Sequence, residues 1–331
     1  MVDSYFSDVL DFGGALESPY DPNDHIYEAL AEGDYYIAEM PEEFDLRPFL
    51  LNARDQGNRG TCAAFAGATM RELIQNRVVS KELVDSPTSI NTLVDTSTSV
   101  NTSVDAPASA NTSVDVPASV NTSVDIITPM EINTTTPTDL VCNEAKKQME
   151  LMNVLTGGSS DVTPLMYMSP EFLYWHRDNK PSSGMYGRNV FQIMQKVGCV
   201  PEALYKYKNR IKPTQDLYNV AEIYKIPHYS RVTSLQGLKR ALLEQGPCYM
   251  QLPLYNNGVE FWKKQDPSDN VHSTAHAVTV VGYTKNGFIV RNSWGSDWNK
   301  SGYVVLPFDD WPIVKECWVI TSEAGTPPSS Y

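Results

Sequence analysis

The feature that most limits what this chain can fold into is a stretch of 101 residues, 66–166, without one Phe, Tyr or Trp. A ten-residue motif recurs inside it, at residues 99–105, 109–115 and 119–125. Sequences this rich in Ser, Thr and Asn bury too little apolar surface to offset the chain entropy that folding removes. We therefore predict that residues 81–141 are a disordered low-complexity insertion in a folded domain. A small stacked β array is the alternative, because Val and Thr alternate within the repeats.

Residues 1–40 form a second unusual segment, with ten Asp or Glu and no Lys or Arg. A run of one charge sign is usually a solvated tail, and that is the first interpretation. Aromatic residues such as Tyr27 and Tyr35 are unusual in a tail, so a segment that covers the domain is the alternative. We divide the chain into an acidic N-terminal segment (1–40), a domain (41–323) that the insertion interrupts, and a C-terminal tail (324–331).

The composition argues against two classes of partner. The chain has 26 Lys and Arg against 40 Asp and Glu, and this net charge of −14 should repel phosphate backbones and anionic lipids. No apolar run is long enough to span a bilayer, and the first residues lack the basic and apolar regions of a secretory signal. Five cysteines are too few, and odd in number, for a disulfide scaffold. We expect a cytoplasmic or otherwise intracellular protein with no nucleic-acid and no membrane partner.

Apolar spacing predicts mainly helices before residue 246 and mainly strands after it. Expected helices cover residues 62–77, the segment that follows a Ser169 N-cap, and segments near 190–197 and 235–246. Expected strands cover residues 248–254, 277–283, 288–291, 303–306 and 317–321. A helical first half followed by a strand-rich second half predicts an α+β fold of two subdomains with a cleft between them.

Cys62 has the sequence context of a nucleophile. It follows a glycine-containing loop and begins the predicted helix 62–77, where the positive end of the helix dipole favours a thiolate. The remaining cysteines lie in apolar or unremarkable contexts, which predict small buried side chains. These are Cys142, Cys199, Cys248 and Cys317.

A cysteine nucleophile needs an imidazole to take its proton and a third group to orient that imidazole. His276 stands at the head of one predicted strand, and Asn292 follows the next. If these strands pair antiparallel around a loop centred near Thr284, the Asn292 amide oxygen can accept the imidazole N–H. This register requires a loop longer than a two-residue turn at Asn286 and Gly287. Taken alone, the pair would favour a hydrogen-bonded surface His and an Asn beside a turn.

Three segments resemble the papain-like cysteine peptidases, the cathepsin family. Residues 56–65, QGNRGTCAAF, resemble the family's Q-G-x-C-G-S-C-W-A-F. Residues 276–283 resemble its H-A-V-x-x-V-G-Y, and residues 292–303 resemble its N-S-W-G-x-x-W-x-x-x-G-Y. The segments stand in the family's order along the chain. The resemblance implies a helical left subdomain and an antiparallel, β-barrel-like right subdomain with the active-site cleft between them.

The resemblance also implies roles for the matching residues. Cys62 would attack the scissile carbonyl, His276 would exchange the proton, and Asn292 would orient His276. Gln56 would donate to the tetrahedral oxyanion, and Trp294 would shield the His–Asn hydrogen bond from water. The implied function is a cysteine endopeptidase that acts on a protein or peptide substrate through a thioester acyl-enzyme, without a cofactor.

The resemblance is weaker in the substrate groove. Gly184 and Thr274 align near the family's second subsite and Ser322 near its floor, which would favour apolar substrate side chains. If the alignment with the family is shifted by one residue, Glu323 instead of Ser322 lies at the floor of this subsite, which would favour Arg side chains in the substrate.

Other positions depart from the family pattern. Arg59 stands where the family has a disulfide cysteine, Ala63 where it has an aromatic residue, and Cys317 lacks its usual partner. These departures indicate a divergent, disulfide-free branch such as occurs in bacteria and large DNA viruses. For a viral protein, the expected location is the host cytoplasm or the virion.

Two other functions stay open. One is a non-catalytic binding or structural protein on the same scaffold, and the other is a related acyl-transfer enzyme, a deubiquitinase or a transpeptidase. Because the family usually carries an inhibitory N-terminal segment, intramolecular inhibition by residues 1–40 is a further expectation. His272 and His276 have the spacing of a zinc pair, but they precede a strand and lack an H-E-x-x-H glutamate, so no metal is expected.

Overall fold

The structure is a computed structural model that describes residues 13–30, 40–85, 165–272 and 274–322. Most of the predicted insertion 81–141 and the predicted tail 324–331 lie outside the described residues, so these two predictions are untested.

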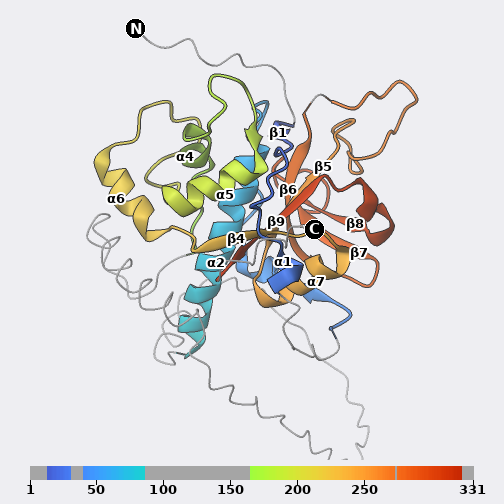
Figure 1. The fold of residues 1–331 in the computed structure, drawn as a ribbon, viewed down its shortest axis with the longest axis horizontal. Helices are drawn as coiled ribbons and strands as arrows, with labels where there is room; N and C mark the ends of the chain where they lie inside the picture. Colours follow the sequence, from blue (N-terminus) through green and yellow to red (C-terminus); the bar gives the residue numbers. More distant parts are fainter. Residues whose placement is uncertain (1–12, 31–39, 86–164, 273, 323–331) are drawn as a thin grey trace, which may run out of the picture.

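Antiparallel strands make up one half of the molecule (Figure 1). Seven strands form one sheet in the order β4–β9–β5–β6–β7–β8, with the short β2 paired to β6. Their bounds are β2 (Phe44–Asp45), β4 (His228–Arg231), β5 (Cys248–Leu252), β6 (His276–Tyr283), β7 (Gly287–Arg291), β8 (Tyr303–Pro307) and β9 (Glu316–Thr321). The side chains of β5, β6 and β7 are buried throughout, so these central strands form the core of this half.

Helices make up the other half, and the long α2 stands between the halves. The helical half contains α2 (Cys62–Asp85), α4 (Pro170–Trp175), α5 (Gly187–Lys196) and α6 (Gln215–Ile223), with the two-residue strand β3 (Met185–Tyr186) before α5. On the side of the sheet lie α1 (Tyr27–Leu30), α7 (Leu235–Glu244) and the 3-10 helices η1 (Arg47–Phe49) and η3 (Phe308–Ile313). None of the described helices is long and apolar enough to cross a membrane.

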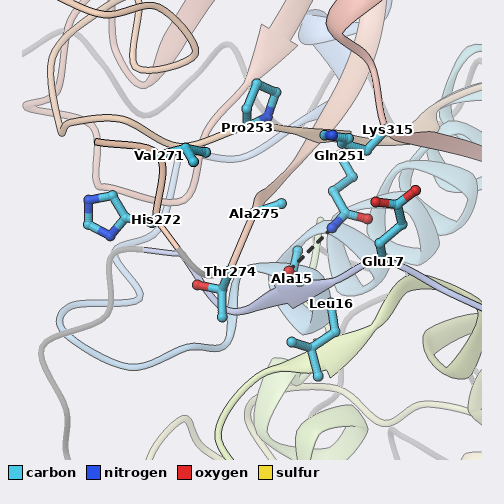
Figure 2. A pocket seen from close by; sticks show the side chains of 10 residues that line it. All are labelled: Ala15, Leu16, Glu17, Gln251, Pro253, Val271, His272, Thr274, Ala275 and Lys315. Carbon is cyan, nitrogen blue, oxygen red and sulfur yellow. Dashed lines mark hydrogen bonds between the residues drawn. The ribbon is translucent and has the colours of Figure 1, made fainter. Parts of the chain in front are cut away.

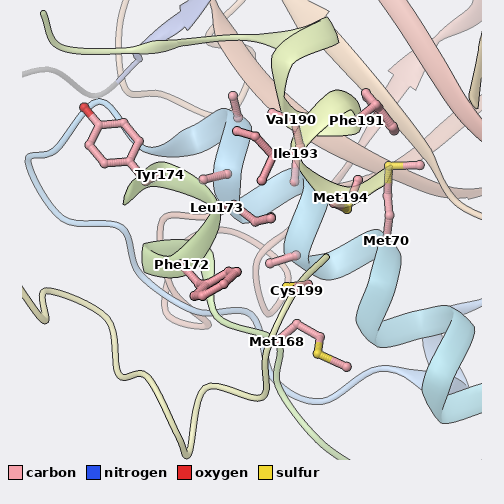
Figure 3. Packing of buried hydrophobic residues seen from close by; sticks show 14 of the residues in the cluster. Met70, Met168, Phe172, Leu173, Tyr174, Val190, Phe191, Ile193, Met194 and Cys199 are labelled. Carbon is pink, nitrogen blue, oxygen red and sulfur yellow. The ribbon is translucent and has the colours of Figure 1, made fainter. Parts of the chain in front are cut away.

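Small side chains let α2 pack closely on both of its sides. Ala63, Ala64, Ala66 and Ala68 in its first turns are all buried. The helix contacts β6 on one side and α4 and α5 on the other, where larger residues such as Phe172 and Met194 fill the space (Figure 3). The start of α2 is therefore fixed against both halves at once.

The predicted α+β architecture with two subdomains is confirmed, with differences in detail. The helix predicted over 62–77 continues to Asp85, so the first residues of the predicted insertion 81–141 are helical. Each predicted strand is present with bounds shifted by no more than two residues. The helix α6 and the strand β4 were not predicted, because β4, of sequence HYSR, contains no apolar run.

The hairpin of β6 and β7 has a different register from the prediction. Tyr283 pairs with Phe288, so the turn is tight and centred beyond Thr284. A register shift between Val280 and Gly282 then bulges β6. The expected longer loop was wrong, and Asn292 lies just past β7 instead of pairing directly with His276 as a strand partner.

Residues 13–30 pack across the molecule. The strand β1 (Ala15–Leu16) pairs in parallel with β3, and α1 contacts α7. Tyr27 is only 2% exposed and belongs to the core of the sheet half. The solvated-tail interpretation was therefore wrong for these residues.

Candidate active site

Cys62 lies at the junction of the two halves, as the first residue of α2. Its thiol is fully buried, and the backbone N–H of Ala277 donates to its Sγ at 3.4 Å. Ala277 directly follows His276 on β6, so this contact holds the sulfur against the strand that carries the imidazole. The helix N-terminus adds a positive field that favours a thiolate.

His276 is buried, and its Nε2 lies 2.7 Å from Oδ1 of Asn292. The backbone N–H of Ser293 donates to the same oxygen at 2.7 Å, which identifies that atom of Asn292 as the acceptor. The Nε2 of His276 must therefore donate. In the neutral ring, Nδ1 is then the nitrogen that can take a proton from a thiol.

Aromatic rings enclose this His–Asn pair. Trp294 stacks on His276 with ring centroids 4.6 Å apart and 28° between the planes. The edge of Phe261 meets the imidazole at 5.1 Å, and the same ring contacts Trp294. The rings exclude water from the hydrogen bond between His276 and Asn292. Phe261 was missed in the sequence, because it lies in an irregular connection outside every recognised motif.

Gln56 is held by its amide oxygen and presents its amide N–H groups to the cleft. Its Oε1 accepts from Ser293 Oγ at 2.6 Å, which orients the amide. Its Nε2 donates to the Arg59 carbonyl at 2.8 Å and to the Gly13 carbonyl at 3.3 Å. The backbone carbonyl of Gly13 in the N-terminal segment thus accepts from the Gln56 side-chain N–H, the donor that the family resemblance assigns to the tetrahedral oxyanion.

Residues 13–18, which we call the strap, run through the cleft. The Met185 N–H donates to the Gly14 carbonyl at 2.8 Å, on the side of the helical half. On the side of the sheet, Ala15 and Ala275 exchange two backbone hydrogen bonds, of 3.0 and 2.9 Å. The strap therefore bridges the helical half and the sheet half of the molecule. Figure 2 shows Ala15, Leu16 and Glu17 of the strap beside the wall residues Thr274 and Ala275.

The predicted groove residues have different surroundings. Thr274 Oγ1 accepts from the Gly14 N–H at 3.2 Å, and Gly184 lies so close to the strap that an added Cβ would be 2.7 Å from the Gly14 oxygen. Both therefore line the cleft. Ser322 follows the end of β9, whereas the strap reaches β9 through Glu316, whose Oε2 accepts from the Ser18 N–H at 3.4 Å. Glu323 lies outside the described residues.

Residues 19–30 anchor the strap away from the cleft. Arg188 of α5 binds both carboxylate oxygens of Asp24, at 2.7 and 2.6 Å. The Glu28 carboxylate accepts from the Thr233 N–H at 2.8 Å and from the Ser234 N–H and hydroxyl at 2.8 and 3.0 Å. Because Ser234 is the N-cap of α7, the N-terminal segment is fastened to both halves of the molecule.

Comparison with known proteins points to one family. The family model described as "Papain family cysteine protease" matches residues 174–322. An uncharacterized peptidase C1-like protein of Acanthamoeba polyphaga mimivirus is 29% identical over 164 residues, which cover 42% of this chain and 52% of that protein. Cathepsin K of Mus musculus is 32% identical over 158 residues, which cover 43% of this chain and 46% of that protein. The crystal structure of xylellain, a cysteine protease from Xylella fastidiosa, has a TM-score of 0.58 at 20% identity and covers 95% of this chain and 97% of that chain.

Residues 174–322 of the chain resemble the papain family of cysteine proteases, and the chain has the fold of that family. It spans about half the length of the curated relatives that it matches. The region matched by the family model contains His276 and Asn292 but starts after Cys62. In the fold, Cys62 and Gln56 of the unmatched region lie beside the His276–Asn292 pair, because Cys62 contacts the residue after His276 and Gln56 contacts the residue after Asn292.

Four of the five cysteines are described, and all four are buried and form no disulfide. Burial raises the pKa of Cys199 to about 12, and it also raises the pKa values of Cys248 and Cys317. These three thiols stay protonated at neutral pH, which leaves Cys62 as the candidate nucleophile among the described cysteines. Cys142 lies outside the described residues.

Within the described ranges, no three His, Cys, Asp or Glu side chains come together in a way that could hold a metal ion. His272 lines a hollow of about 210 Å³ beside the strap, with Val271, Gln251 and Lys315 (Figure 2).

Proposed function

We propose that this protein is a cysteine endopeptidase that hydrolyses peptide bonds through Cys62, His276, Asn292 and Gln56. The observation that carries the proposal is the position of the Cys62 sulfur against β6. It lies 3.4 Å from the N–H that follows His276, while Asn292 holds the opposite ring nitrogen of His276 at 2.7 Å. A binding protein would need none of these polar contacts at the start of a buried helix.

The chemistry follows from this arrangement. The Cys62 thiolate attacks the carbonyl carbon of the substrate, and the carbonyl π electrons move to the oxygen. Gln56 Nε2 and the Cys62 N–H donate to that oxyanion, and loss of one such donor typically costs about 3 kcal/mol of transition-state stabilisation. His276 gives its Nδ1 proton to the leaving amine as the C–N bond breaks. A water that loses a proton to His276 then attacks the thioester and releases the acid and the thiolate.

We further propose that the strap inhibits this reaction within the same chain. The support is the Gly13 carbonyl on the Gln56 amide and the complete burial of Cys62, which shares a core cluster with Ala15 of the strap. A tethered segment acts at roughly millimolar effective concentration, so a weak intrinsic affinity is enough to occlude the cleft. The protein is then latent until the strap leaves the cleft.

The free thiols at Cys199, Cys248 and Cys317 support an intracellular, reducing location for the enzyme.

The test is labelling with a thiol-directed epoxide inhibitor, followed by mass mapping and peptide hydrolysis assays. We expect the label on Cys62 and no turnover by Cys62→Ser, because a serine hydroxyl lacks the accessible pKa of a thiol. Cys199→Ser is the matched control and should keep both turnover and labelling. Turnover by Cys62→Ser, or label on another cysteine, would disprove the assignment.

A further inference from the structure

The two groups assigned to the oxyanion stand at opposite ends of residues 56–62, which we call the oxyanion loop. Gln56 carries its side-chain amide at the start of the loop, and Cys62 carries its backbone N–H at the end, where α2 begins. Two of the five residues between them, Gly57 and Gly60, are glycines, and Gly57 has a φ of +60°. Because a glycine backbone is conformationally permissive, the loop alone does not fix the distance between the two donors.

The hydroxyl of Tyr207 joins the two ends of the oxyanion loop. It donates to the Gln56 backbone carbonyl at 2.8 Å, and it lies 2.8 Å from Oγ1 of Thr61, the residue before Cys62. A phenolic hydroxyl has one hydrogen and a carbonyl can only accept, so Thr61 must donate the second hydrogen bond. Gln56 and Thr61 are both fully buried, so hydrogen bonds within the protein must satisfy their polar atoms.

Tyr207 reaches the oxyanion loop from the connection between α5 and α6, in the helical half. Its backbone N–H donates to Glu202 Oε1 at 3.2 Å. Its ring makes a T-shaped contact with Phe65 of α2, with the centroids 4.8 Å apart, and the Arg59 guanidinium lies 5.2 Å from the ring centroid. Contacts with the connection, the helix and the loop therefore hold the hydroxyl at one place.

The backbone position of Gln56 determines where its side-chain amide points. Gln56 Nε2 donates to the Arg59 carbonyl at 2.8 Å and to the Gly13 carbonyl at 3.3 Å. The Arg59 carbonyl belongs to the loop, whereas a substrate replaces the strap, so the N–H that meets Gly13 is the one that would meet an oxyanion. The Gln56 backbone is held on one side by the Ser293 carbonyl, which accepts from the Gln56 N–H at 2.8 Å, and by Tyr207 at its own carbonyl.

We propose that Tyr207 is a positioning residue for the oxyanion of the peptidase reaction; this inference rests on the proposed function. Its hydroxyl sets the distance between the Gln56 amide and the Cys62 N–H, and it acts through the oxyanion loop instead of on the reacting atoms. Donors stabilise an oxyanion only when they are aimed at the position where its charge develops, so a small displacement of one donor slows the reaction.

Tyr207 has this role in its neutral form. Burial raises the pKa of Tyr207 to about 12, although the hydrogen bond with Thr61 and the charge of Arg59 act in the opposite direction. The hydroxyl therefore keeps its hydrogen at neutral pH and stays a donor to Gln56. Because it does not titrate there, its removal should leave the pH profile of Cys62 ionisation unchanged.

The test compares two reactions of Cys62 in the full-length protein. Alkylation by iodoacetamide forms an S–C bond at a saturated carbon and expels iodide, so no oxyanion develops; mass mapping follows it at Cys62. Hydrolysis of a fluorogenic peptide requires the oxyanion. The strap slows both reactions through the same occluded fraction of molecules, so the ratio of kcat/KM to the alkylation rate constant reports oxyanion stabilisation alone.

Tyr207→Phe, which removes the hydroxyl and keeps the ring, should lower this ratio by about 10-fold or more. The alkylation rate should not fall, and its pH profile should match that of the wild type. Tyr205→Phe is the matched control, because the Tyr205 hydroxyl donates to the Ile211 carbonyl at 2.6 Å, outside the oxyanion loop. It should keep the wild-type ratio.

A double variant shows whether Tyr207 acts through Gln56. Gln56→Ala should lower the ratio by about 100-fold or more. Adding Tyr207→Phe to it should lower the ratio by less than about 3-fold further, because no side-chain amide is left to position. Thr61→Val removes the other hydroxyl of the chain of hydrogen bonds. It should lower the ratio by about 3-fold or more, and it decides if Tyr207→Phe does not fold.

The outcomes separate this inference from the peptidase function. A wild-type ratio in Tyr207→Phe, together with a lowered ratio in Gln56→Ala, would overturn the inference and keep the peptidase. A parallel loss of alkylation and hydrolysis in Tyr207→Phe would also overturn it, because a merely structural residue has that effect. Alkylation of Cys62 without any peptide hydrolysis by the wild type would overturn both.

Discussion

Gly14 of the strap packs directly against Gly60, in the loop that leads to Cys62. A Cβ added at Gly14 would lie 2.3 Å from the Gly60 Cα, and Gly14 has a φ of +112° that other residues rarely adopt. The strap therefore fits the cleft only with glycine at this position. Both restrictions act on the backbone, so rotation of a neighbouring side chain cannot relieve them.

Gly14→Ala should release the strap and raise activity in the full-length protein. The added methyl meets the Gly60 backbone and imposes an unfavourable φ, whereas the anchor through Asp24 and Tyr27 stays in place. We expect labelling of Cys62 by an epoxide, and kcat/KM on a small peptide, to rise by about 10-fold or more for a loss of roughly 1.4 kcal/mol or more in strap binding. Tyr20→Ala, a change at an 83% exposed residue of the same segment, is the control and should leave both rates unchanged. Equal rates for Gly14→Ala and the wild type would exclude a cleft-blocking role.

Asn292→Ala should lower kcat by about 10-fold to 100-fold, because His276 would lose the acceptor that fixes its ring orientation. The aromatic rings of Trp294 and Phe261 still hold the imidazole in place, so a complete loss is not expected. Steady-state kinetics in a Gly14→Ala background give the clearest measurement, since the cleft is open there. Unchanged kcat would mean that another group orients His276.

The position of a family disulfide cysteine is taken by an ion pair. The guanidinium of Arg59 binds Glu171 at 2.6 and 3.1 Å, and Glu171 also accepts from the Lys208 N–H at 2.8 Å. Both side chains are largely buried, at 10% and 1% exposure. The pair ties the loop before Cys62 to α4.

Arg59→Met should lower the free energy of unfolding by about 3–5 kcal/mol, because it leaves the Glu171 carboxylate buried without its counter-charge. The double variant with Glu171→Met should be less destabilised than the sum of the two single variants. Urea denaturation measures all three. Lys225→Met, which breaks an exposed pair with Glu222, is the control and should cost less than about 1 kcal/mol. Additive effects in the double variant would show that the ion pair is not coupled.

The residues that meet at the active site could be found in the sequence because each lies in a short motif. Gln56 and Cys62 share one loop and helix start, and His276 and Asn292 stand at the ends of neighbouring strands. The predicted register of the β6–β7 hairpin was wrong, but the predicted contact between His276 and Asn292 is still present. It forms because Asn292 lies just beyond β7, within reach of the His276 ring.

The strap could not be found in this way. The strap forms only two residue pairs with β3, and no apolar pattern of that length predicts a strand. The acidic composition of residues 1–40 favoured a tail, although Asp24 and Glu28 are the residues that anchor the segment.

Removal of the strap and removal of the whole N-terminal segment should have different effects. A chain that begins at Ser18 keeps the anchor and should unfold within about 1 kcal/mol of the full-length protein, with an open cleft. A chain that begins at Pro41 also loses Tyr27, which is 2% exposed, and the Glu28 carboxylate that accepts three hydrogen bonds near the start of α7. Loss of a large buried aromatic side chain typically costs about 3–5 kcal/mol, so this shorter chain should unfold at a markedly lower urea concentration.

Urea unfolding of the three chains, with epoxide labelling of Cys62 under native conditions, separates the two roles. Equal stability of the chains that begin at Ser18 and Pro41 would contradict the anchor, and equally slow labelling of the Ser18 chain and the full-length protein would contradict the strap.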